Sequence, residues 1–129
     1  MDQITVSTAA KQEMTVKRFI NEHLRKLGCS ERTRIYVDVA VDEAFSNIAN
    51  NAYYPETGAV TVGVRRETNP LAAVITFIDN GMPGNPLKEK KKSGQAAGET
   101  GLYIVKKVMD DVSYAYREGR NILTMRKKL

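Results

Sequence analysis

The sequence contains very few of the residues that build disulfide bonds and transition-metal sites. Cys29 is the only cysteine and His23 the only histidine among 129 residues. One cysteine excludes an intramolecular disulfide and a cysteine-based zinc cluster, and one histidine excludes a histidine-rich metal site. Because neither residue has a recognisable partner in the sequence, we interpret both as structural or surface residues.

Long apolar runs are also missing. No stretch approaches the roughly 20 apolar residues that span a bilayer, and the first residues, MDQITVSTAAKQEM, lack the pattern of a signal peptide. We therefore expect a cytoplasmic protein without membrane contacts. The length of 129 residues, with 42% hydrophobic and 27% charged residues, predicts one folded domain over residues 1–129.

The formal net charge of +5 permits nucleic acid as a partner. Residues 88–92, KEKKK, carry four positive charges and one negative charge, which is +3 of that total. The rest of the chain is only mildly basic, and it has no RNP-like aromatic motif or helix-turn-helix signature. A nucleic-acid-binding domain is therefore an alternative that the charge permits, but we expect no direct contact with nucleic acid.

Two helices are predicted in the first half of the chain. Residues 2–7 alternate weakly and predict an edge strand. From Thr8 to Leu27, apolar residues recur every three or four positions, as in an amphipathic helix, and Gly28 ends it. Ser30 is a typical helix cap, and the helix that follows is predicted to run to about Ala52.

The second half is predicted to be mostly strands. Ala59–Arg66 and Ala72–Asp79 form a predicted hairpin, Leu102–Met109 a helix, and Val112–Arg117 and Ile122–Lys127 a last pair of strands. Contiguous strands after a helical half favour an α+β fold over a doubly wound parallel sheet. We expect a two-layer sandwich in which a mixed, mainly antiparallel sheet has its helices on one face.

A stretch of about twenty residues, 80–101, has no apolar periodicity and is rich in glycine, proline and lysine. Loops of that length are usually functional, such as lids, or disordered. The lysines of residues 88–92 could attract phosphates or an acidic partner, and the simpler interpretation is a solvated loop. We assign no catalytic role to them.

Three groups of residues could carry chemistry. Glu43, Asn47 and Asn51 recur every four positions on the second helix, so that one carboxylate and two carboxamides offer hard oxygen ligands suited to Mg²⁺ with phosphate. A solvated polar face would show the same spacing. The segment Asp79–Gly84 follows a strand and could bind an exocyclic amine, or it could be an ordinary turn.

The third group is Gly98-Glu99-Thr100-Gly101-Leu102, before the predicted third helix. Backbone N–H groups at a glycine-rich helix start can cradle phosphate. The spacing matches neither a Walker P-loop nor a dinucleotide-binding motif, so this group by itself is weak evidence.

Taken in order along the chain, the three groups resemble the sequence boxes of the GHKL (Bergerat-fold) ATP-binding domains. Within them the sequence is similar to the small bacterial anti-sigma-factor serine/threonine kinases. VDEAFSNIANNAYYP matches the N box, FIDNGMPG the G1 box and GETGLYIVKKVMDDVSY the G2 box. Pro83 stands where larger members often have a glycine, and Ala97 replaces a glycine of many relatives.

The resemblance implies a role for each matching residue. Glu43 would be the general base, Asn47 the Mg²⁺ ligand beside the ATP phosphates, and Asn51 a further lining residue. Asp79 would bind the adenine amino group, and Gly81 would make room for the base. The residues that would close over the phosphates are Gly98, Thr100, Gly101 and Leu102, with a lid loop at about 82–100.

The resemblance also implies an activity and partners. ATP and Mg²⁺ would be the cofactors, and the enzyme would transfer the γ-phosphate to a serine or threonine of a small STAS-type antagonist protein. Separately, the domain would bind a sigma factor. The alternative is an ATP-binding module without kinase activity that acts by nucleotide-dependent protein binding. Members of the branch often dimerise, and the sequence leaves open a homodimer through the first two strands.

Overall fold

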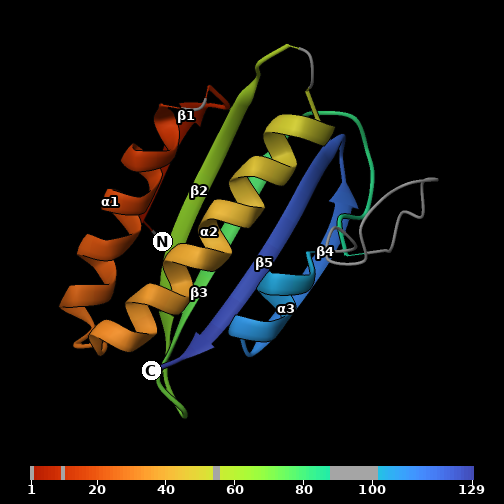
Figure 1. The fold of residues 1–129 in the computed structure, drawn as a ribbon. Coiled ribbons are helices and arrows are strands. Elements are labelled where there is room, and N and C mark those ends of the chain that lie inside the picture. Colours follow the sequence, from red (N-terminus) through yellow and green to blue (C-terminus); the bar gives the residue numbers. More distant parts are fainter. Residues whose placement is uncertain (1, 10, 54–55, 88–101) are drawn as a thin grey trace.

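The computed structural model describes residues 2–9, 11–53, 56–87 and 102–129 (Figure 1). Five strands and three helices occur in these residues. The strands are β1 (Asp2–Ser7), β2 (Ala59–Glu67), β3 (Ala72–Asp79), β4 (Asp111–Arg117) and β5 (Arg120–Lys128). The helices are α1 (Gln12–Lys26), α2 (Glu31–Asn51) and α3 (Tyr103–Val108).

The strands form one sheet in the order β1-β2-β3-β5-β4. Each of the four strand pairings is antiparallel. The fold is therefore the expected α+β sandwich, and its described sheet is antiparallel rather than mixed. A two-residue turn, Glu118-Gly119, joins β4 to β5. Both residues have positive φ angles, of 51° and 77°, as a tight turn that matches the twist of a hairpin requires.

All three helices lie on the same face of the sheet (Figure 1). The buried core lies between the two layers. It is made of alternate side chains of the strands and of one face of each helix, among them Ile20, Phe45, Ile75, Val105 and Met125. Apolar side chains at helical spacing in α1 and α2, and at alternating spacing in β2, form these two surfaces.

The first helix begins later than its apolar spacing predicts. Thr8 is buried, and its backbone N–H donates to the Gly58 carbonyl at 2.9 Å. The Gly58 N–H donates in turn to Thr8 Oγ1 at 3.1 Å. These bonds continue the contact between the ends of β1 and β2 by one residue, so α1 begins at Gln12 instead of Thr8. The predicted cap of α2 is confirmed, since Ser30 Oγ accepts the Thr33 N–H at 3.1 Å.

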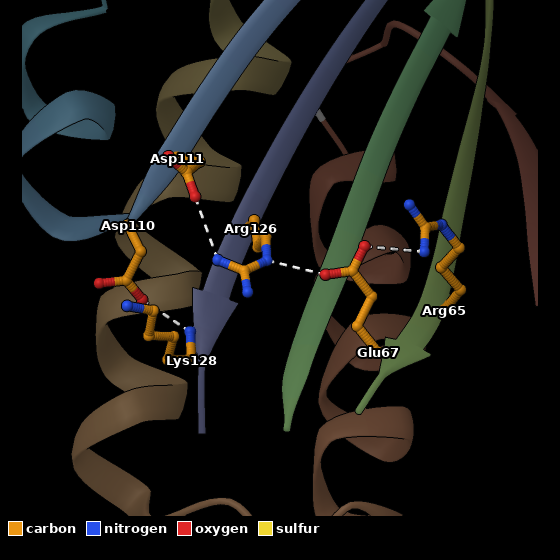
Figure 2. A network of polar contacts seen from close by, with 6 residues as sticks. All are labelled: Arg65, Glu67, Asp110, Asp111, Arg126 and Lys128. Carbon is orange, nitrogen blue, oxygen red and sulfur yellow. Dashed lines mark hydrogen bonds and ion pairs between the residues drawn. The ribbon is translucent and has the colours of Figure 1, made fainter. Parts of the chain in front are cut away.

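The sheet face opposite to the helices carries a row of ion pairs (Figure 2). Arg126 of β5 donates from Nε to Glu67 at 2.8 Å and from Nη1 to Asp111 at 3.1 Å. Glu67 also accepts a bond from Arg65 Nη1 at 3.1 Å. The Glu67–Arg126 pair bridges β2 and β5 across the intervening β3. Val74 of β3 is only 1% exposed there, although none of the described helices covers this face.

Among the helices that the structure describes, none is both long enough and apolar enough to cross a membrane.

Candidate functional site

The candidate site is built around the carboxylate that ends β3. Asp79 is only 4% exposed. Its Oδ1 accepts the Gly81 N–H at 2.9 Å and the Asn121 Nδ2–H at 2.9 Å. Among the described residues, no hydrogen bond reaches Asp79 Oδ2. The carboxylate is thus oriented through one oxygen and keeps the other as an acceptor.

Asn121 and Tyr114 hold this carboxylate and the turn that follows it. Asn121 lies directly across from Asp79 in the β3–β5 register. Besides Asp79, its Nδ2 donates to the Met82 carbonyl at 3.2 Å, and its Oδ1 accepts a hydrogen bond from the Tyr114 hydroxyl. The Gly84 N–H donates to that same hydroxyl at 3.3 Å. Neither residue was predicted from the sequence to belong to the site, because only the strand register brings them to Asp79.

Gly81 allows the turn after β3 to lie against the end of α2. A Cβ atom on Gly81 would stand 2.5 Å from the Ala52 Cβ and 2.7 Å from the Ala52 carbonyl oxygen. The next residue, Met82, donates its N–H to that same Ala52 oxygen at 3.0 Å. A side chain at position 81 would therefore separate the Asp79 turn from α2.

Tyr53 makes a second connection between α2 and this turn. Its hydroxyl donates to the Ala59 carbonyl at 2.8 Å and accepts the Asn80 N–H at 2.9 Å. Burial raises the pKa of Tyr53, and the nearby Asp79 carboxylate adds to that rise, while the bond from Asn80 lowers it. The phenol thus keeps the proton with which it bonds to β2.

Glu43 and Asn47 lie on the same helix, nearer to its middle. Glu43 is exposed, and Asn47 is half-buried one turn further on. At a rise of about 1.5 Å per residue, they lie about 14 Å and about 8 Å along α2 from Ala52. The predicted base and the predicted Mg²⁺ ligand therefore lie on the helix whose C-terminal end contacts the Asp79 turn. Asn51 is the last residue of α2, and its side chain is outside the described residues.

The third predicted group is described only at its end. Gly98, Thr100 and Gly101 lie outside the described residues, as does most of the predicted lid. Leu102 is 6% exposed and has a positive φ of 51° where the chain enters α3. From α3, Lys106 Nζ donates to the Leu87 carbonyl at 2.7 Å. The segment that leaves the Asp79 turn is thereby tied to the helix that follows the predicted lid.

The donor set suits magnesium better than a transition metal. Within the described part of the chain, no three histidine, cysteine, aspartate or glutamate side chains are grouped to hold a metal ion. Mg²⁺ bound to a nucleotide needs only one or two protein oxygens, because phosphates and water supply the rest. The Asn47 amide oxygen, with the Glu43 carboxylate one turn earlier, fits that requirement.

Comparison with protein families supports a nucleotide-binding domain. Residues 6–127 match the family model described as histidine kinase-like ATPase domain. The matched range includes α1, α2 and α3, the strands β2 to β4, and β5 up to residue 127. No curated protein matches the sequence.

Proposed function

The chain belongs to the family of histidine kinase-like ATPase domains, and from that premise we propose that it is a serine/threonine protein kinase and an anti-sigma factor. In this proposal it binds ATP with Mg²⁺ and transfers the γ-phosphate to a small STAS-type antagonist protein. It also binds a sigma factor and keeps it inactive.

The Asp79 carboxylate is the observation that carries the nucleotide part of the proposal. It is 4% exposed and is held by two hydrogen bonds to Oδ1. An exocyclic amine such as that of adenine would donate to Oδ2. A charged acceptor in a site sheltered from water discriminates strongly for such a donor, because an unpaired buried carboxylate is unfavourable.

Glu43 and Asn47 support phosphoryl transfer. This reaction depends mainly on positioning and on neutralising charge. Glu43 is exposed and can reach a hydroxyl of another protein, from which it would accept the proton. Asn47 would hold Mg²⁺, which neutralises phosphate charge when it is bound with ATP.

The surroundings of His23 bear on which group accepts the phosphoryl group. His23 is the only histidine of the chain. Its Nε2 lies 2.7 Å from Asp2 Oδ2, and its Nδ1 lies 2.9 Å from the Phe19 carbonyl oxygen. Both ring nitrogens are engaged, so neither is free to accept a phosphoryl group.

Incubation with ATP, Mg²⁺ and a candidate antagonist protein, followed by mass measurement of the antagonist, tests the proposal. We expect the antagonist to gain the mass of one phosphoryl group. Glu43→Gln should bind ATP as the unchanged protein does but transfer phosphate at least about 100-fold more slowly, the usual contribution of a general base. Asp79→Ala should lose ATP binding itself.

Glu31→Gln is the matched control, because Glu31 is an exposed glutamate in the first turn of the same helix. Its transfer rate should stay unchanged. Wild-type transfer by Glu43→Gln would show that another group is the base. ATP binding without transfer to any antagonist would identify the chain as a binding module that lacks kinase activity.

A further inference from the structure

A polar cavity lies far from the Asp79 turn. Its volume is about 470 Å³, and it is lined by residues of β1, of β2 and of the last turn of α1: Asp2, His23, Lys26, Leu27, Val64, Arg65 and Arg66. Asp79 pairs with Val60 at the start of β2, six residues before Arg66. At about 3.3 Å per residue, the two places are about 20 Å apart along that strand.

Positive charge gathers in this cavity without a matching number of acids. Lys26 and Arg66 form no ion pair and no side-chain hydrogen bond with any residue that the structure describes. Arg65 is already paired with Glu67 at 3.1 Å, on the open face of the sheet (Figure 2). Two exposed cations from different elements therefore line one concave surface with no ion pair or side-chain hydrogen bond to the described residues, although the charge of Lys26 also acts on Asp2.

Asp2 is the one acidic residue among the described residues that line the cavity, and it is bonded to His23 of the same lining. Its Oδ2 lies 2.7 Å from His23 Nε2. That hydrogen bond and the charge of His23 lower the pKa of Asp2, and the charge of Lys26 adds a smaller contribution in the same direction. The carboxylate is therefore ionised near neutral pH and held by the imidazole. It offsets only part of the positive charge of the cavity.

A helix end explains only part of this arrangement. Lysine in the last turn of a helix is favoured by the helix dipole, and this accounts for Lys26. It does not account for Arg66, which belongs to a strand. Leu27 and Val64 add apolar surface to the same wall.

We propose that this cavity is an oxyanion-binding site, in which Lys26 and Arg66 hold the phosphate or carboxylate group of a small ligand. Arginine presents two parallel N–H donors to such a group, and lysine adds a point charge. The site is separate from the candidate nucleotide site and does not depend on the proposed kinase activity.

Titration of the full chain with inorganic phosphate at constant ionic strength tests this site, with backbone amide NMR signals as the readout. We expect saturable shifts at residues 26, 27 and 64–66. The double variant Lys26→Ala/Arg66→Ala should weaken phosphate binding there about tenfold, the loss expected when charge-assisted hydrogen bonds are removed. Signals of residues 79–84 report separately on phosphate at the nucleotide site.

Arg25→Ala is the matched control, because Arg25 lies in the same last turn of α1 but lines a different cavity. Its phosphate affinity should stay within about twofold, since only long-range, screened charge is lost. A parallel titration with acetate distinguishes the ligands: tighter phosphate assigns the site to phosphoryl groups, and similar affinities assign it to oxyanions in general. Absence of saturable shifts in the unchanged chain, or equal losses in Arg25→Ala, would overturn the proposal.

Discussion

At the scale of single residues, the Asp79 carboxylate is supported by Asn121, which bonds to it, and by Tyr114, which acts on it only through Asn121. The Tyr114 hydroxyl bonds to Asn121 Oδ1, and Asn121 Nδ2 bonds to Asp79 Oδ1. Hydrogen bonds in a chain of this kind orient one another, and each gains strength away from water. Tyr114 therefore acts as a positioning residue, through Asn121, for the acceptor that we propose for adenine.

Tyr114→Phe tests this network by removing one hydroxyl. Asn121 Oδ1 then loses its donor, and the Gly84 N–H loses its acceptor. We expect the free energy of unfolding to fall by about 1–2 kcal/mol, the cost of buried polar groups left unpaired, and ATP to bind more weakly. Urea denaturation and calorimetric titration with ATP measure the two effects.

Tyr116→Phe provides the control for that measurement. Tyr116 lies two residues further along β4 and is 48% exposed. Losing its hydroxyl should change the free energy of unfolding by no more than about 0.5 kcal/mol, as for most surface substitutions. Equal effects of the two variants would mean that the Tyr114 hydroxyl does not support Asp79.

At the scale of secondary-structure elements, α1 and α2 are joined by polar contacts beside their apolar interface. Lys17 Nζ lies 2.6 Å from Asp42 Oδ1, and Asn21 Nδ2 donates to Asp38 at 2.8 Å. Glu13, one turn before Lys17, faces the same Asp42. A hydrogen bond with the Asp42 carboxyl, followed by burial and by the charge of Asp42, raises the pKa of Glu13 to about 7.

This raised pKa predicts that stability falls as pH rises from about 5 to about 7. Glu13 keeps its proton in the folded chain at pH values where the unfolded chain has already released it, so the folded state binds more protons across that range. Glu13 is only partly buried, so the loss should be no more than about 1 kcal/mol. Urea denaturation at pH 5.5 and pH 7.5 measures it.

Glu13→Gln should remove that part of the pH dependence, because an amide does not titrate. Glu22→Gln is the control, since Glu22 is an exposed glutamate on the same helix, and it should leave the pH profile unchanged. A profile of Glu13→Gln that still falls with the slope of the unchanged chain would assign the effect to another group.

At the scale of the whole molecule, the proposed nucleotide site spans the sandwich. It takes Glu43 and Asn47 from α2, Asp79 from β3, and support from β4 and β5. A ligand that binds only the folded chain stabilises the entire fold, because these elements separate when the chain unfolds.

ATP with Mg²⁺ should therefore raise the melting temperature. At a nucleotide concentration ten times the Kd, the gain is about 1.4 kcal/mol, or about 4 °C for a domain of this size. Calorimetry or a thermal shift assay measures it. Asp79→Ala should show no such gain, and the absence of a shift in the unchanged chain at saturating nucleotide would contradict ATP binding.

The sequence alone determined the order and type of the elements. Apolar spacing predicted α2 and the β2–β3 hairpin, and Ser30 was identified as the cap of α2. These features are local, so neighbouring residues suffice to predict them. The sequence motifs also led to the ATP-binding family that the comparison supports. The roles predicted for Glu43 and Asn47 stay predictions.

Only the tertiary structure decided what supports the candidate site. Asn121 is 42 residues from Asp79 along the chain and reaches it through strand register. The apolar spacing predicts a helix from Thr8, but Thr8 bonds to Gly58, 50 residues away, so α1 begins later, at Gln12. Lys26 and Arg66 likewise line one cavity only because α1 packs beside β2. Such contacts depend on the register between distant segments, and the spacing of residues within one segment does not predict that register.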